Sequence, residues 1–383
     1  ARLYFHIPCC AHKCGECKLF SQQCCDAERI SLYLHTMRRQ AEQLSVAAQG
    51  LKFTSFAVGG GTPLILDEGQ LEELFCLAEL FGVHPSRVFT SVETSPEYTQ
   101  KSVLRQLRAR GVERLSMGVQ SFNETELKKL KRRPGLGTVV GALENIVEAG
   151  FPQFNLDLIY GIEGQTVESF MRSLNTALTY RPNELFIYPL YVRPGTRINV
   201  RSTDDIGYAI YKSARELLVG QGFVQTSMRR FVRRETTETE FSCGDEVMLS
   251  CGAGGRSYLG NLHYATPYAV RQQAIADEID HYIRTTDFMT AANGFLLSTE
   301  EMQIRFIIKI LMYHRGVDLA EYEKRFGEKP DRNLFREFTD RGWIEETGRI
   351  VRLTEEGMAY SDYIGQAFIS PVVRKLMSEY VYP

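Results

Sequence analysis

The segment Cys10-Ala11-His12-Lys13-Cys14-Gly15-Glu16-Cys17 holds three thiols at spacings of four and three residues, directly after the apolar segment 3–7. Thiolates are the usual protein ligands of iron–sulfur clusters. Three cysteines leave one iron of a four-iron cubane without a protein ligand, and an open coordination position is where chemistry can occur. The spacing alone leaves two alternatives open. One is thiols that bind no metal, and the other is a structural zinc ion with a fourth ligand from Cys9, His12, Cys24 or Cys25.

The composition is that of an ordinary folded protein, because 44% of the 383 residues are hydrophobic and 24% are charged. Five of the nine cysteines fall within sixteen residues, which favours a metal site over a disulfide framework. The formal net charge of −2 gives no positive field to attract nucleic acid or an anionic membrane. No long apolar run and no cleavable leader is found, so we expect a cytoplasmic protein without a membrane anchor.

Short β-type segments alternate with helical segments across the first half of the chain. In the helical segments, apolar residues return at every third or fourth position. This alternation predicts βαβ units, a parallel sheet and an α/β fold, and six such units predict a partial (β/α)6 barrel. The expected strands are 3–7, 53–58, 88–93, 114–119, 155–160 and 184–190, and the expected helices are 27–48, 68–81, 99–110, 139–149 and 166–180.

Several expected strands end in polar or glycine-rich residues, and the C-terminal ends of barrel strands form the catalytic face. Glycines let a ligand approach the backbone closely, and their exposed N–H groups can bind a carboxylate. A tight turn would explain one such segment, but a three-cysteine loop one strand earlier makes the combination more specific. The segments of this rim are Gly59-Gly60-Gly61-Thr62-Pro63, Glu93-Thr94-Ser95-Pro96, Gly118-Val119-Gln120-Ser121-Phe122 and Asp157-Leu158-Ile159-Tyr160-Gly161.

The remaining chain predicts two further parts. We expect the barrel over residues 1–200, an α/β extension on the substrate side over 201–297, and a helical, winged-helix-like domain over 298–383. The last of these rests on helical periodicity followed by a hairpin at 342–345 and 349–354. Winged-helix modules often bind DNA, but without a basic excess we favour a packing role.

Together, these motifs resemble the oxygen-independent coproporphyrinogen III oxidase (HemN-like) family of the radical S-adenosylmethionine (SAM) superfamily. They stand in the family's order, and the similarity extends through the C-terminal tail, which implies a HemN-like C-terminal domain. The resemblance implies that the open iron of a [4Fe-4S] cluster binds the amino and carboxylate groups of SAM. One electron then breaks a sulfonium C–S bond, which gives methionine and a 5′-deoxyadenosyl radical that abstracts hydrogen from the substrate. It also implies a flavodoxin or ferredoxin as electron donor.

The resemblance also assigns roles to residues that match the family's motifs. The cluster ligands would be Cys10, Cys14 and Cys17, and the residues that contact the first SAM would be Tyr4, Gly60 and Glu93. Family members can bind a second SAM, for which the matching residues are Gly61, Thr62, Gln120, Arg132 and Asp157. Arg256, in a later glycine cluster, is a further candidate. Each charged residue alone would also suit a salt bridge at the barrel rim.

Two departures from the family point to a less characterised branch rather than to the oxidases themselves. Where family members have an aromatic residue before the third cysteine, this chain has Glu16, so stacking on a SAM adenine is lost there. The oxidases carry another cysteine two residues after the third, whereas this chain has Lys18-Leu19-Phe20. We also expect the N-terminal extension of the oxidases' substrate site to be absent. Porphyrinogen decarboxylation therefore ranks behind other reactions.

The leading hypothesis is a radical SAM enzyme that modifies a small organic substrate. It would act by hydrogen abstraction or, with a second SAM, by methyl transfer or cyclopropanation, and we expect a monomer. The alternatives are coproporphyrinogen III oxidase-like decarboxylation and a haem chaperone with His6, His12 or His263 as haem ligand. The residues expected to line the substrate cavity, or else to be core side chains, are Tyr188, Tyr191, Arg193 and His263. For Cys243 and Cys251 we favour buried small side chains over thiols that support the site.

Overall fold

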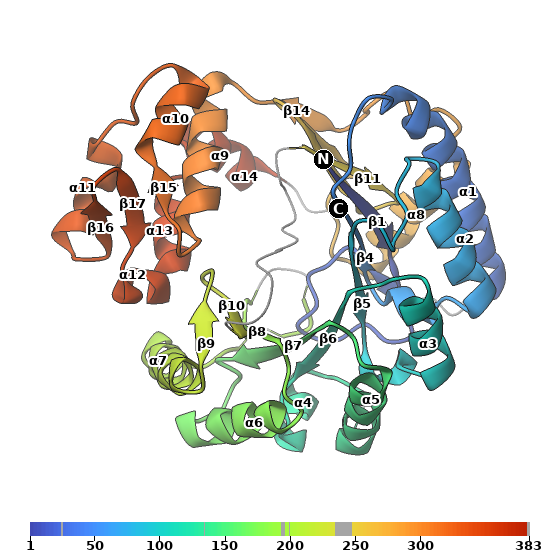
Figure 1. Ribbon diagram of the computed structural model, residues 1–383, viewed down its shortest axis with the longest axis horizontal. Helices are drawn as coiled ribbons and strands as arrows, with labels where there is room; N and C mark the ends of the chain where they lie inside the picture. Colours follow the sequence, from blue (N-terminus) through green and yellow to red (C-terminus); the bar gives the residue numbers. More distant parts are fainter. Residues whose placement is uncertain (24–25, 134, 193–195, 199, 234–246, 381–383) are drawn as a thin grey trace.

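A twelve-stranded mixed sheet, curved into an open barrel, forms the centre of the molecule (Figure 1). The computed structural model describes residues 1–383 except 24–25, 134, 193–195, 199, 234–246 and 381–383. Six neighbouring strands of the sheet follow chain order and are parallel. They are β1 (Arg2–Ile7), β4 (Ser55–Gly60), β5 (Phe89–Thr94), β6 (Arg114–Gln120), β7 (Gln153–Tyr160) and β8 (Glu184–Pro189). The predicted α/β class and partial (β/α)6 barrel are thereby confirmed.

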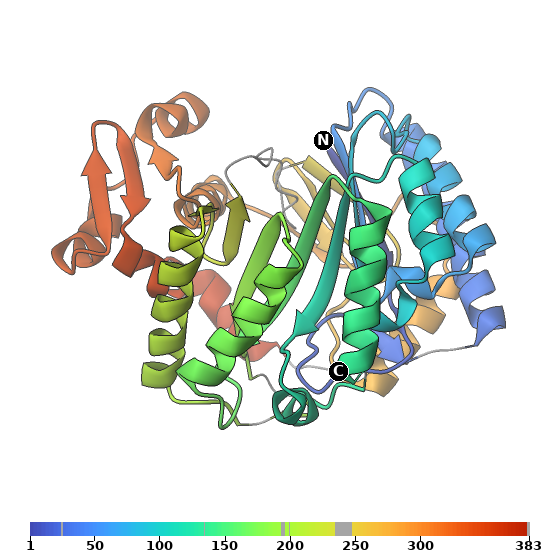
Figure 2. The same ribbon diagram turned by 60° about the horizontal axis from the view of Figure 1, so that its bottom comes forward.

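A helix crosses between each pair of consecutive parallel strands, as the periodicity predicts. The crossing helices lie on the outside of the barrel, and Figure 2 shows them beside the strands. Their ends agree with the predicted ones to within a few residues. They are α1 (Ala27–Ala47), α2 (Glu68–Glu79), α3 (Lys101–Ala109), α5 (Leu136–Ala149) and α6 (Val167–Thr179).

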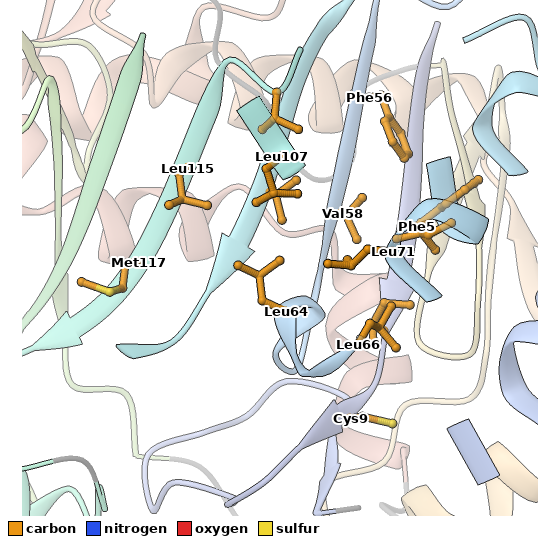
Figure 3. Close-up of a cluster of buried hydrophobic side chains, with 14 of the residues drawn as sticks. Phe5, Cys9, Phe56, Val58, Leu64, Leu66, Leu71, Leu107, Leu115 and Met117 are labelled. Atoms are coloured by element: carbon orange, nitrogen blue, oxygen red, sulfur yellow. The ribbon is translucent and has the colours of Figure 1, made fainter. Parts of the chain in front are cut away.

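Alternate residues of the parallel strands face opposite sides of the sheet, because the side-chain period of a strand is two. On β7, Phe154, Leu156 and Leu158 belong to the main hydrophobic core, which the helices cover. Figure 3 shows part of this core, where Phe5 and Phe56 of the strands lie near Leu71 of α2. The residues between them face the barrel interior, so polar side chains such as Asp157 reach the site without disturbing the core.

Strands after residue 220 extend the sheet at both ends, where the sequence predicts only a weaker alternation. β11 (Val247–Cys251) pairs in parallel with β1, and β12 (Arg256–Leu259), β13 (Leu262–Ala265) and β14 (Gly294–Leu296) continue the sheet by antiparallel pairing. At the other end, β10 (Arg230–Arg233) pairs with β8, and β9 (Phe223–Gln225) pairs with β10.

The C-terminal part has a hydrophobic core of its own, which includes Phe306, Leu311, Phe338 and Ile364. It contains α9 (Thr299–Leu311), α10 (Leu319–Phe326), α11 (Asn333–Asp340) and a three-stranded sheet of β15 (Val317–Asp318), β16 (Ile344–Thr347) and β17 (Ile350–Leu353), followed by α12 (Glu355–Ala359), α13 (Ser361–Ala367) and α14 (Pro371–Glu379). The predicted winged-helix-like α+β tail is confirmed, whereas the exact domain limits stay predictions. In Figure 1 these elements lie beside α7 (Asp204–Gly220). None of the helices in the described ranges is long and apolar enough to cross a membrane.

Candidate functional site

A pocket lies at the C-terminal ends of the parallel strands, where the sequence predicts the rim. Its walls come from the cysteine loop after β1 and from the ends of β4, β5, β6, β7 and β8. Ten residues predicted for the site line it, namely Cys10, Cys14, Cys17, Gly60, Gly61, Thr62, Glu93, Gln120, Arg132 and Asp157.

The three cysteines are carried by a loop that internal hydrogen bonds hold in shape. The short strands β2 (Cys9–Cys10) and β3 (Gln22–Gln23) pair and close the loop at its base. Inside it, the buried Lys13 ammonium donates to the carbonyl of Leu19 at 2.7 Å and to the carbonyl and hydroxyl of Ser21, both at 2.8 Å. The loop is therefore ordered by its own residues before any cofactor is considered.

All three cysteines are free thiols. Burial, followed by the nearby Cys17 thiol, raises the pKa of the Cys10 thiol to about 11, and burial raises the pKa of Cys14 to about 12. Thiols with such pKa values stay protonated at neutral pH unless a positive centre binds them, because metal binding must release the protons. A cofactor that binds these cysteines as thiolates must therefore displace protons that burial holds on the thiols.

The residues fit a [4Fe-4S] cluster better than a single zinc ion. Zinc holds its ligands about 2.3 Å from one centre, whereas a cubane spreads its thiolates over separate corners. Among the described residues, no three His, Cys, Asp or Glu side chains converge closely enough to hold one metal ion. The three thiols nevertheless line one pocket. Three thiols that share a pocket without converging on one point suit a cluster.

The glycine run at the end of β4 packs directly against the cysteine loop. A Cβ atom on Gly61 would lie 2.5 Å from the carbonyl oxygen of Cys9 and 2.7 Å from Cys10 Sγ. Gly60 has a φ of 119°, a conformation open to glycine. The Thr62 hydroxyl lies 3.8 Å from Cys10 Sγ. The predicted link between GGGTP and the cysteines is thus a physical contact, and bulkier residues would disrupt it.

Two carboxylates face the pocket from neighbouring parts of the sheet. Glu93 accepts a hydrogen bond from the N–H of Gly60 at 3.2 Å. Desolvation by the surrounding protein atoms is the largest influence on Glu93. Together with the negative charge of Asp157, it raises the pKa of the Glu93 carboxyl to about 7. The side chain is nevertheless exposed to the open pocket, so solvent limits this rise. Burial, the largest influence, raises the pKa of Asp157 to about 6 although Asn155 donates to it at 2.7 Å.

Arg132 and Glu16 form an ion pair that also lines the pocket. The Nη1 of Arg132 donates to Oε1 of Glu16 at 3.0 Å, and its Nη2 donates to the carbonyl of Gly118 at 2.9 Å. Gln120 stands beside them with a φ of 71°, at a β-bulge in the pairing of β6 with β7. The side-chain amide of Gln120 lies 2.5 Å from where a Cβ of Gly118 would be, so a larger residue at this position would require the Gln120 side chain to move.

Some predicted site residues lie outside this group. Tyr4 is buried on β1, where its hydroxyl lies 3.2 Å from Nδ1 of His6, next to Gly59 rather than among the lining residues. Arg256 is exposed at the start of β12 and does not line the pocket. Of the expected cavity residues, Tyr188 and Tyr191 line the pocket and His263 does not. Cys251 is fully buried. Arg193, Cys24, Cys25 and Cys243 lie outside the described residues.

Sequence reasoning missed residues that support the site. Asn155 is fully buried and donates to both Asp157 and the Ser116 hydroxyl at 2.7 Å, so it orients the carboxylate. The available signal was a second polar residue two positions before Asp157, which places both on the same face of a strand. Lys13 was also missed. The available signal was a lysine between two cysteines of the loop, where a charged side chain needs acceptors within the loop itself.

Comparison with known proteins agrees with this geometry. Residues 4–177 match the radical SAM superfamily and residues 297–360 match the HemN C-terminal domain. The heme chaperone HemW of Bacillus subtilis is 26% identical over 96% of this chain and 98% of its own. The oxygen-independent coproporphyrinogen III oxidase of Escherichia coli is 27% identical over 85% of this chain and 74% of its own.

The fold has a solved counterpart. The solved structure of Escherichia coli coproporphyrinogen III oxidase (HemN) superposes with a TM-score of 0.81 and 23% identity, over 96% of this chain and 89% of that one. At this sequence identity, the superposition shows only that the two folds are alike. The relationship to known protein families rests on the two domain matches. The chain therefore joins a radical SAM domain, over residues 4–177, to a HemN C-terminal domain, over residues 297–360.

Proposed function

We propose that this protein is an enzyme that holds a [4Fe-4S] cluster on Cys10, Cys14 and Cys17, cleaves SAM reductively and modifies a small organic substrate. One observation supports this most directly. Three free thiols line the same pocket as the glycine turn of β4 and the carboxylates of Glu93 and Asp157. When bound, the cluster would supply one electron and an open iron for the amino acid part of SAM.

The chain's own residues would bind and orient SAM. The N–H groups of Gly60, Gly61 and Thr62 already donate to Glu93 and to the carbonyls of Ile7 and Cys9, so the turn does not offer them to a carboxylate. Glu93 can accept from an ammonium or a ribose hydroxyl. Desolvation by a bound ligand would raise the pKa of Glu93 further, but a cationic or hydroxyl donor opposes that rise. Tyr191 and Tyr188 would close the side of the pocket away from the glycines.

The test is anaerobic reconstitution followed by SAM and dithionite. We expect brown protein that releases 5′-deoxyadenosine. If a second SAM is the hydrogen donor and gives up its one-carbon group, S-adenosylhomocysteine should form in addition to 5′-deoxyadenosine. The Cys14→Ala variant should lose the chromophore and all turnover, whereas Cys76→Ala, at an exposed cysteine on α2, should keep both. Unchanged iron in Cys14→Ala would contradict the ligand assignment.

A haem chaperone is the second candidate, because several relatives carry that name. His263 gives it structural support. Its ring stacks on Tyr258 at a centroid distance of 4.2 Å, and its Nε2 is buried without a hydrogen-bond partner among the described residues. Burial, then Arg256 and Arg305, lower the pKa of His263 to about 4, which leaves the neutral imidazole that binds metals. In His6, by contrast, both ring nitrogens are engaged, by Tyr4 and by the Phe20 carbonyl.

Titration with ferric haem distinguishes the two candidates. If the protein is a chaperone, its haem complex should show a Soret band that shifts in His263→Ala and not in His84→Ala, which changes a partly exposed histidine that does not line the pocket. Tight haem binding without any SAM cleavage would favour the chaperone. Porphyrinogen decarboxylation ranks third, because Leu19 stands where the oxidases carry their additional cysteine. The electron donor, a monomeric state and a cytoplasmic location remain predictions.

A further inference from the structure

Glu16 presents an unsatisfied acceptor to the pocket. Its side chain is only 9% exposed and lines the pocket, one residue before the third cysteine. Oε1 accepts from Arg132, but Oε2 is buried and has no hydrogen-bond partner among the described residues. Buried carboxylate oxygens are nearly always satisfied, so an orphan of this kind that borders a cavity indicates a missing donor from a ligand.

The pairing also changes what Arg132 can do. A guanidinium with no other partner at this position could bind a ligand carboxylate through two parallel hydrogen bonds. Here one branch of the guanidinium is bonded to Glu16 and the other to the carbonyl of Gly118, and the side chain is 91% buried in this arrangement. An anionic ligand would therefore compete with a carboxylate that is already in place.

The other charges near this end of the pocket strengthen the preference. Asp157 is the register partner of Gly118 on the adjacent strand, so its carboxylate lies near the Arg132 guanidinium. Lys13 is turned into the cysteine loop, where three oxygens hold its ammonium. The ammonium of Lys18 lies 3.7 Å from the centre of the Tyr191 ring. Arg132 thus faces two carboxylates, and the two lysines are engaged elsewhere.

We propose that the end of the pocket formed by Glu16, Arg132 and Asp157 binds the ammonium group of an amine-bearing substrate, with Oε2 of Glu16 as its acceptor. The inference rests on the proposed function, in which this pocket holds the substrate beside SAM. It narrows the substrate class to amines and ranks a carboxylate, including that of a second SAM, as a poor ligand for this end of the pocket.

A matched pair of probes tests the proposal. Putrescine and succinate have the same number of carbons and opposite charge. Each is added in radiolabelled form to reconstituted, SAM-saturated protein, and binding is measured by equilibrium dialysis. We expect putrescine to bind with a stoichiometry near one and at least about tenfold more tightly than succinate. In Glu16→Gln the preference for putrescine over succinate should fall by about tenfold or more. The acceptor then carries no negative charge, and Arg132 has lost its counter-ion.

Two controls make the result interpretable. Glu163→Gln removes an exposed carboxylate paired with Lys129 and should keep the preference for putrescine. Iron content and the change that SAM causes in the electron paramagnetic resonance spectrum of the reduced cluster are recorded for every variant. Equal or tighter binding of succinate, no binding of putrescine, or an unchanged preference in Glu16→Gln would each overturn the proposal. If SAM leaves the cluster spectrum unchanged while putrescine binds through Glu16, the proposed function fails and the amine preference stands.

Discussion

His6 joins the first strand of the barrel to the cysteine loop. It is 5% exposed, its Nε2 lies 2.8 Å from the carbonyl of Phe20, and the hydroxyl of Tyr4 lies 3.2 Å from its Nδ1. A carbonyl can only accept, so Nε2 carries the proton and Nδ1 accepts from Tyr4. Burial, the largest influence, lowers the pKa of His6 to about 4. A second proton would break the bond with Tyr4 and loosen the loop.

Acidification should therefore destabilise the protein through His6. The unfolded chain takes up this proton near pH 6.5 and the folded protein only near pH 4. Stability that is complete above pH 6.5 is lost as pH falls through this interval, by up to about 3 kcal/mol. Urea unfolding at several pH values should show a smaller decline for His6→Gln than for the wild type. His84→Gln, at an exposed site, should keep the wild-type decline. Identical pH profiles for His6→Gln and the wild type would refute this role.

Gly61→Ala should prevent the cluster loop from closing. The added methyl group would overlap the Cys9 carbonyl and the Cys10 sulfur, and backbone cannot move aside as a flexible side chain can. We expect a destabilisation of about 1–3 kcal/mol and loss of most iron after reconstitution. Gly141→Ala is the matched control, because nothing lies within 4 Å of its Cβ position on α5. It should keep its iron and gain about 0.5–1 kcal/mol. Full iron in Gly61→Ala would show that the contact is dispensable.

Single residues also mark the limit of what the sequence predicts about the site. The cysteines, glycines and carboxylates of the pocket were predicted because their motifs are local and repeat at strand ends. Glu16 was identified only as a departure from the family. Its pairing with Arg132 joins positions more than a hundred residues apart, and only the closed barrel brings them together.

Among the elements, β4 connects the hydrophobic core to the site. Phe56 is fully buried on its helix-covered side, with the rings of Phe5 and Phe75 at centroid distances of 5.1 and 6.5 Å. Phe56→Ala should lower the free energy of unfolding by about 3–5 kcal/mol, from lost burial and the cavity left behind. Denaturant unfolding measures this. Val46→Ala, where the side chain on α1 is 64% exposed, should change stability by less than about 0.5 kcal/mol. A small loss in Phe56→Ala would mean that the core refills the space.

The elements differ in how far the sequence predicts them. The six βα units are long, and strictly periodic apolar residues define both their strands and their helices. Strands β9 to β14 have only three to five residues each; β13 is half-buried and β14 is exposed. Short edge strands bury little and take their pairing from neighbours in the sheet, so local pattern alone does not identify them.

At the scale of the whole molecule, a polar cluster connects the C-terminal domain to the wall of the pocket. The Tyr191 hydroxyl donates to Asp362 Oδ1 of α13 at 2.8 Å and accepts from Arg229 at 2.8 Å. Arg229 is 4% exposed and pairs directly with Asp362. The aromatic ring of the same tyrosine contacts the Lys18 ammonium of the cysteine loop. We therefore expect a displacement of the C-terminal domain to alter this wall of the pocket.

Asp362→Ala should loosen this connection. It leaves the buried Arg229 guanidinium without its carboxylate, at a cost of about 1–3 kcal/mol because Asp362 itself is partly exposed. Hydrogen exchange should quicken in α13 and around Tyr191, and if the pocket holds substrate, turnover should fall while cluster content stays constant. Glu346→Ala removes an exposed partner of Arg332 in the same domain and should change neither hydrogen exchange nor turnover. Since backbone bonds such as Met228 N–H to the Met312 carbonyl remain, the domain should stay attached. Faster exchange confined to α13, with Tyr191 unaffected, would show that the domain packs beside the barrel without influencing the pocket.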